Sequence, residues 1–132
     1  MKYLLDTNIC IYLINGNETL KKKIKEIGVF SLSISNATLA ELYFGAYNSQ
    51  KVDANLQRIN EFKKNLIVYS DNNASAKAFG RFKSKLRSEG NIIEDFDILI
   101  ASVAFVNNCT LVTNNPNHFE RIDELNVENW LG

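Results

Sequence analysis

The sequence predicts an α/β fold in which a short parallel sheet is covered by helices on both faces. Short apolar segments alternate with amphipathic ones along the 132 residues. Strands that are joined by crossover helices form parallel sheets, and both faces of such sheets are buried. Ligands of these sheets bind at the carboxyl ends of the strands, so the residues that follow each strand are the first candidates for a functional site.

The expected elements follow from hydrophobic periodicity and from capping residues. Strands are expected at 2–6, 31–35, 66–69 and 110–113, with a last short strand at 126–130. Helices are expected at 9–14, 18–27, 36–47, 52–66, 71–87 and 96–106. Thr7 or Asn8 is expected to cap the first helix, Asn17 the second, and Ser35 or Asn36 the third. The helix at 96–106 is nearly all apolar, so it is expected to be buried.

The composition excludes some classes of protein. Hydrophobic residues make up 45% and charged residues 23%, which is ordinary for one globular domain spanning residues 1–132. With 15 basic and 15 acidic residues the net charge is zero, so no overall positive charge indicates a nucleic-acid binder. The apolar runs are too short to cross a bilayer, and an acid at position 6 argues against a signal peptide. We therefore expect a cytoplasmic protein without membrane contact, with free thiols at Cys10 and Cys109.

Three acids and one amide are expected at the same edge of the sheet. Asp6 ends the first strand and Asn115 follows the strand at 110–113, so both lie at carboxyl ends. Glu41 belongs to the helix after the second strand, and Asp97 opens the buried helix at 96–106. Four oxygen-bearing side chains from four elements are therefore expected to converge.

A cluster of three carboxylates favours a bound cation. Two ionised carboxylates about 4 Å apart repel by roughly 4 kcal/mol at an effective dielectric constant of about 20. Oxygen ligands without a neighbouring Cys or His suit Mg²⁺ or Mn²⁺, and such an ion can activate water for phosphodiester hydrolysis. Each acid alone also has an ordinary structural explanation: a helix cap for Asp6, a solvated helix edge for Glu41, and a partner of the helix dipole for Asp97.

Several motifs, in this order and at these distances, resemble those of the PIN-domain ribonucleases, and more narrowly of the VapC toxins of bacterial toxin–antitoxin pairs. They are Tyr3 to Asn8, Ser33 to Ser35 with Thr38 to Leu42 and Gly45-Ala46, Asp97 to Ala101, Leu111 to Asn115, Phe119 to Ile122 and Glu128 to Trp130. The resemblance covers nearly the whole chain. It implies a three-layer α/β/α fold in which Asp6, Glu41 and Asp97 bind Mg²⁺ or Mn²⁺.

The same resemblance implies an activity and partners. VapC proteins cleave RNA, often tRNA, are held inactive by a VapB antitoxin and are typically homodimers, so we expect the same of this chain. Thr7, Asn8 and Thr113 look like the family's residues that support the acids.

The implied mechanism is hydrolysis of a phosphodiester bond. Asp6 and Asp97 hold the metal, Glu41 orients or deprotonates the attacking water or binds a second ion, and Asn115 positions the ligands of the metal. Many PIN domains carry a fourth acid where this chain has Asn115, and an amide offers an oxygen but no charge, which weakens the case for a second tightly held ion. His118 also stands where an acid is frequent, and we expect it at the surface or facing the RNA.

An acidic site needs basic residues around it if it is to bind RNA. Lys77, Arg81 and Lys85 share one face of the helix at 71–87 and are the best candidates, although a solvated face explains them equally well. The lysines at 21–25 are expected only to be solvated. Four aromatic residues exceed the needs of a core stripe, and exposed ones would suit a groove for an amphipathic antitoxin segment: Tyr43, Phe44, Tyr47 and Phe62.

Two other classes of function stay open. A non-catalytic PIN-like module would bind a partner protein through its apolar helices and would cleave nothing. A receiver-like domain would use Asp6 in phosphate transfer, but such domains place an acid pair at the end of the first strand and the acceptor on a later strand. That order is absent from this chain.

Overall fold

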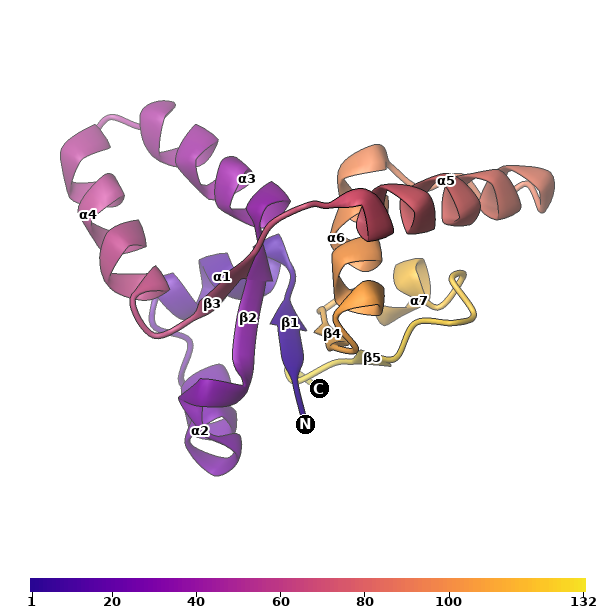
Figure 1. Ribbon diagram of the computed structural model, residues 1–132. Coiled ribbons are helices and arrows are strands. Elements are labelled where there is room, and N and C mark those ends of the chain that lie inside the picture. Colours follow the sequence, from indigo (N-terminus) through magenta and orange to yellow (C-terminus); the bar gives the residue numbers. More distant parts are fainter.

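A parallel sheet runs through the centre of the computed structural model, which describes all 132 residues (Figure 1). Its five strands lie in the order β3-β2-β1-β4-β5, and every neighbouring pair is parallel. They are β1 (Tyr3–Leu5), β2 (Leu32–Ser35), β3 (Ile67–Tyr69), β4 (Thr110–Val112) and β5 (Val127–Glu128). The parallel sheet expected from the sequence is therefore confirmed, including its last short strand.

Helices connect the strands on both sides of the sheet. They are α1 (Thr7–Ile14), α2 (Glu18–Ile27), α3 (Asn36–Tyr47), α4 (Val52–Lys63), α5 (Asn73–Ser88), α6 (Asp95–Val106) and α7 (Pro116–Phe119), with a 3-10 turn η1 (Val29–Ser31). In Figure 1, α3 and α4 project to one side of the sheet and α5 and α6 to the other. The chain leaves β1 toward β2 and β3, and later returns to β4 on the opposite side of β1. Ligands of α/β sheets bind at such a reversal of strand order.

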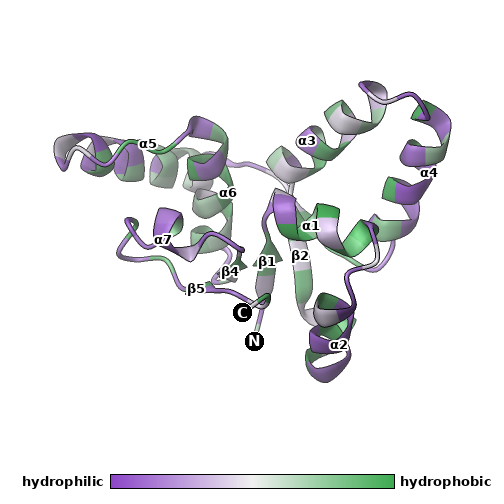
Figure 2. Ribbon diagram, turned by 180° about the vertical axis from the view of Figure 1, so that it is seen from behind, coloured by the Kyte–Doolittle hydropathy of each residue, from purple (hydrophilic) through white to green (hydrophobic).

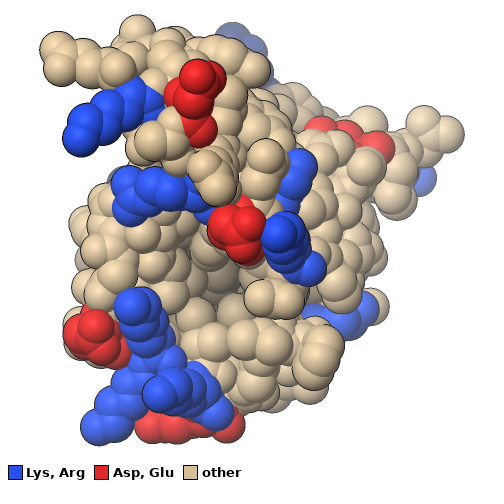
Figure 3. Space-filling model, turned by 90° about the vertical axis from the view of Figure 1, so that its left-hand side faces the viewer, with Lys and Arg blue, Asp and Glu red and all other residues tan.

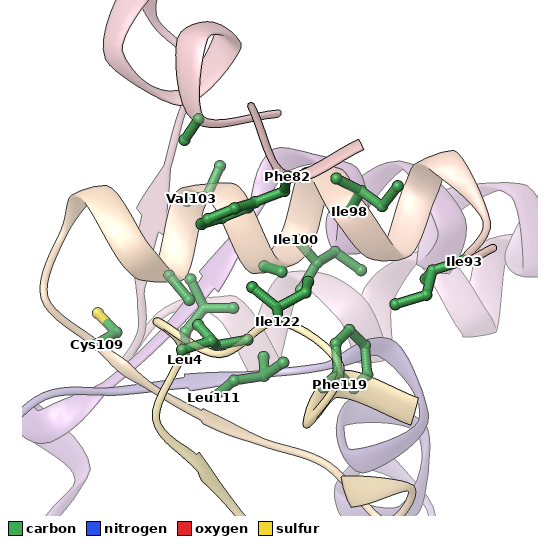
Figure 4. Packing of buried hydrophobic residues seen from close by; sticks show 14 of the residues in the cluster. Leu4, Phe82, Ile93, Ile98, Ile100, Val103, Cys109, Leu111, Phe119 and Ile122 are labelled. Carbon is green, nitrogen blue, oxygen red and sulfur yellow. The ribbon is translucent and has the colours of Figure 1, made fainter. Parts of the chain in front are cut away.

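Each face of the sheet has its own hydrophobic core, because successive side chains of a strand point to opposite faces. Leu4 and Leu111 pack with α5, α6 and the C-terminal segment, as Figure 4 shows around Phe82. Leu5 and Val112 pack with side chains of α1, α2, α3 and α4. In Figure 2, hydrophobic residues dominate β1, α1 and α6, whereas the outer helices alternate in character. The three-layer α/β/α fold is therefore confirmed.

The start of α1 differs from the expectation. Asp6, and not Thr7 or Asn8, caps the helix, and Oδ1 of Asp6 accepts a hydrogen bond from the backbone N–H of Ile9 at 3.0 Å. Aspartate is as good an N-cap as asparagine or serine, so the strand passes into the helix without a loop. As a result, α1 begins two residues earlier than the sequence pattern predicts.

Two short elements, η1 and α7, were not expected from the sequence. Both are shorter than the window in which helical periodicity can be recognised. Pro116 occupies the first turn of α7, where its fixed φ suits a helix start and its missing N–H costs nothing. Cys10 and Cys109 are free and buried, as expected. None of the helices combines the length and the apolar character that a membrane crossing requires.

Candidate active site

The carboxylate of Asp6 lies at the carboxyl end of β1 and is only 6% exposed. The backbone N–H of Asp6 donates to the carbonyl of Val112 at 3.0 Å, which continues the β1–β4 ladder up to this residue. Oδ1 is held by the cap of α1. The orientation of the carboxylate is therefore fixed by both a strand and a helix, and its second oxygen is not used by the cap.

Burial raises the pKa of Asp6 above the ordinary value of 3.8, because the charged form loses water. Hydrogen bonds from the Thr113 side chain and from the backbone N–H of Ile9 lower this pKa, and the charges of Asp97 and Glu41 raise it further. The structure thus brings the three predicted acids within electrostatic reach of one another, and it places Thr113 against the first of them.

A row of hydroxyl groups holds Glu41, which lies on α3. The Thr7 hydroxyl donates to Oε1 of Glu41 at 2.5 Å and lies 3.3 Å from the Thr38 hydroxyl. Thr38 in turn lies 3.4 Å from the hydroxyl of Ser35, which accepts the Thr38 backbone N–H at 3.1 Å as the N-cap of α3. Thr38 and Glu41 share a helix face because they are three residues apart. The cap of α3 and the acid of the site therefore belong to one network.

Asp97 lies in the first turn of α6 and contacts the single histidine of the chain. Oδ2 of Asp97 is 3.0 Å from Nε2 of His118, and the two side chains are 34% and 24% exposed. This contact differs from the expectation of a surface or RNA-facing histidine. The ring is largely buried and touches an acid of the site.

Two predicted site residues have side chains without a hydrogen bond inside the protein. Asn8, in the first turn of α1, and Asn115, the residue before α7, are both exposed. The backbone N–H of Asn115 donates to Oγ1 of Thr113 at 3.1 Å, so Asn115 is held near the edge of the site. The roles expected for these two asparagines stay predictions.

The three acids lie at one edge of the sheet without surrounding a common centre. No group of three His, Cys, Asp or Glu side chains is close enough together to hold a metal ion. Glu41 is engaged by Thr7, and Asp97 by His118. The chemistry of the donors nevertheless fits a hard divalent cation, because carboxylate oxygens are its preferred ligands and a cation relieves the repulsion between them.

The three basic residues predicted on α5 differ in their contacts. Arg81 pairs with Glu124 and Lys85 with Asp123, both in the C-terminal segment, whereas Lys77 is exposed and has no ionic partner. Exposed ion pairs contribute only about 0–1 kcal/mol, so a phosphate can replace the carboxylate at small cost. Contact of these residues with RNA stays a prediction.

Basic side chains do not form one continuous positive surface. On the side of the molecule shown in Figure 3, basic and acidic side chains alternate, and the largest basic group lies at the lower end. The helix at that end in Figure 1 is α2, which carries Lys21, Lys22, Lys23 and Lys25. These lysines lie at the opposite end of the sheet from the three acids.

Together, the fold and these residues define a class of protein: an α/β fold with an acidic centre at the carboxyl edge of a parallel sheet. The family model described as PIN domain matches residues 3–125. "Ribonuclease VapC2" of Rickettsia felis is 37% identical to this chain over 132 residues, and the alignment covers 98% of each chain. "tRNA(fMet)-specific endonuclease VapC" of Shigella flexneri is 34% identical over 130 residues, again 98% of both chains.

Solved structures show the same similarity. The crystal structure of VapBC2 from Rickettsia felis bound to a promoter DNA fragment contains a chain that superposes with a TM-score of 0.93 at 35% identity, covering 98% of this chain and 99% of that one. The chain therefore belongs to the PIN-domain family, among the VapC ribonucleases. PIN-domain ribonucleases generally depend on a divalent metal.

The sequence did not predict the contacts that three residues make with the acids or their supports: Ser35, Thr38 and His118. The first two had a usable signal, because Ser35, Thr38 and Glu41 are spaced three residues apart at a helix start. For His118 the only signal was its place where an acid is frequent among the proteins that the chain resembles. Its contact with Asp97 depends on a one-turn helix that the periodicity does not reveal.

We expect Asp6→Asn to raise the free energy of unfolding at neutral pH when no metal is added. Asparagine removes a buried charge and still caps α1 through its side-chain oxygen. Because the folded-state pKa of Asp6 lies above 3.8, the folded protein binds this proton more tightly than the unfolded chain does. The difference in free energy of unfolding between the variant and the wild type is therefore largest above the folded-state pKa of Asp6. It decreases as the pH falls through that pKa and vanishes below 3.8.

Urea unfolding of both proteins across this pH range measures the difference. The control is Asp71→Asn, at an exposed position, which is expected to show no such pH dependence. An Asp6→Asn protein that is less stable than the wild type at neutral pH would contradict the argument.

Proposed function

We propose that the chain is the toxin of a type II toxin–antitoxin pair, an endoribonuclease that requires Mg²⁺ and cuts tRNA. The observation that carries this proposal is the burial of Asp6 against Thr113 within electrostatic reach of Glu41 and Asp97. Three carboxylates in such a position are stabilised by a divalent cation, and their oxygens suit Mg²⁺, with Mn²⁺ as the alternative.

Asp6 and Asp97 hold the ion in this proposal, and Glu41 completes the site directly or through water. The ion, when bound, makes a water molecule more acidic and stabilises negative charge on the phosphodiester. Oε1 of Glu41 accepts the hydrogen bond from Thr7, so Oε2 remains to orient the attacking water or to accept its proton. No protein nucleophile is required.

The names of similar proteins support the substrate and the partner. The Shigella flexneri relative is named a tRNA(fMet)-specific endonuclease, and the Rickettsia felis structure is of VapBC2. By this similarity we infer that the chain cleaves tRNA in the cytoplasm, is bound by a VapB-type antitoxin and forms a homodimer.

We expect Asp6→Asn to lower the rate of RNA cleavage by at least about 100-fold and to relieve growth arrest, since metal activation of water contributes several kcal/mol. Cleavage of total tRNA is measured with Mg²⁺ and with EDTA, and circular dichroism confirms that the variant folds. Asp71→Asn serves as the control with full activity. A fully active Asp6→Asn protein rules out the metal site, and a wild type that binds an antitoxin without cleaving any RNA points to the non-catalytic module.

A groove beside Glu41 suits an antitoxin segment. Its volume is about 250 Å³, and it lies between α1, α3 and α4. Its apolar lining includes Ile11, Leu42 and Ile59, while Glu41 and Arg58 add one charge of each sign. Phe44 and Tyr47 lie on α3, the helix that carries Glu41, and are 70% and 67% exposed. An amphipathic segment bound here buries apolar surface and lies against Glu41, so it blocks the site that it recognises.

We expect Gly45→Phe to weaken antitoxin binding by at least about tenfold, because large side chains added at an interface remove well-packed contacts. Gly45 lines the groove, and a Cβ at this position meets no atom within 4 Å, so the new side chain fills the groove without straining α3. Gly80→Phe on α5 is the matched control, since its Cβ also meets no atom within 4 Å and it lies outside the groove. Titration calorimetry with a VapB-type antitoxin compares the two. Equal affinities of the two variants would refute the groove as the docking site.

We expect the double variant Lys77→Ala, Lys85→Ala to bind RNA more weakly at low salt. If both lysines contact phosphates, the slope of log affinity against log salt becomes shallower by about 1 for each lost contact. The control is Lys22→Ala, Lys25→Ala on α2, at the opposite end of the sheet, where both lysines are exposed without an ion pair. RNA binding by an Asp6→Asn background, which avoids cleavage, is measured over a range of salt. If both double variants behave alike, α5 has no special role.

A further inference from the structure

His118 occupies a fixed position beside the proposed metal site. Pro116 begins α7 and restricts its backbone. Phe119, the residue after the histidine, is only 2% exposed and belongs to the core that contains Leu111. The His118 and Phe119 rings meet edge to face with their centroids 5.3 Å apart. The orientation of the imidazole is therefore restricted by its contacts with Phe119 and Asp97.

The contact between His118 and Asp97 has the dimensions of two adjacent metal ligands. Nε2 and Oδ2 are 3.0 Å apart. In an octahedral site with bonds of about 2.1 Å, two neighbouring ligand atoms lie about 3.0 Å from each other. A cation that bound to both atoms would replace the hydrogen bond that now joins them. The two side chains and Asp6 would have to close around it, because no three such side chains are close enough together in this structure.

The other ring nitrogen makes this exchange feasible. Nδ1 of His118 has no hydrogen-bond partner in the protein, so it can carry the ring proton and leave the lone pair of Nε2 free. The side chain is 24% exposed, so solvent reaches part of the ring.

We propose that His118 is a ligand of the divalent cation, so that the site of this chain contains one imidazole nitrogen together with the oxygens of Asp6 and Asp97. This inference rests on the proposed function, because it requires the same metal site. It departs from the all-oxygen site expected from the sequence. An imidazole donor raises the affinity for later transition ions such as Co²⁺ relative to Mg²⁺.

The single histidine of the chain allows a direct test. Untagged protein is loaded with Mn²⁺, and nitrogen coupling to the ion is measured by electron spin echo envelope modulation. Protein grown with unlabelled histidine is expected to show ¹⁴N coupling of a directly bound imidazole, and protein grown with ¹⁵N-histidine is expected to show ¹⁵N coupling instead. This comparison needs no substitution, so a folding defect cannot imitate the result.

Two variants complete the experiment. His118→Asp is expected to lose the nitrogen coupling, to keep Mg²⁺ binding, and to weaken Co²⁺ binding about tenfold in calorimetry. Asp6→Asn is expected to lose metal binding altogether. Bound Mn²⁺ without histidine coupling overturns the role of His118 and leaves the proposed function standing. Failure of the wild type to bind any of the three ions overturns both.

Discussion

The buried carboxylate of Asp6 connects the fold of this chain to its chemistry. Its backbone continues the ladder between β1 and β4, and its Oδ1 begins α1, so one residue ends the central strand and starts the first helix. A charge at a position only 6% exposed is costly even with the hydrogen bonds from Ile9 and Thr113, yet the cap of α1 requires an acceptor there. A cation bound to the second oxygen, as in the proposed function, would satisfy both conditions. In that case the position of Asp6 would link the start of α1 to metal binding.

The other two acids come from opposite sides of the sheet. Glu41 lies on α3 beside Leu42, which belongs to the core with Leu5, whereas Asp97 lies on α6 beside Ile98, which belongs to the core with Leu4. Each is held by a neighbour, Glu41 by a hydroxyl and Asp97 by an imidazole. An ion that gathers all three carboxylates would therefore tie the two cores together across the end of the sheet, and its binding free energy would add to the stability of the whole fold.

Much of this arrangement could be predicted from the sequence, because it depends on periodicity and on chain direction. The alternation of apolar segments predicts the parallel sheet, and the carboxyl ends of its strands locate Asp6 and Asn115. The expected helix positions bring Glu41 and Asp97 to the same edge. The resemblance to the family adds the supporting residues Thr7, Asn8 and Thr113.

What could not be predicted depends on segments without periodicity. The position of His118 is set by a four-residue helix. The acids that pair with Arg81 and Lys85 lie in the loop after that helix. The cap of α1 was assigned wrongly because Asp6, Thr7 and Asn8 are all good capping residues. Only the backbone geometry decides among them.

The number of charges in the site bears on how many ions it binds. Asp6, Glu41 and Asp97 supply three negative charges, and neither Asn115 nor His118 can supply a fourth. One divalent ion leaves a single negative charge, and a second leaves an excess of positive charge buried at the sheet edge. A phosphate of the RNA would bring the missing negative charge. The chemistry of the residues therefore favours one ion held by the protein alone, with a second held only when the substrate is present.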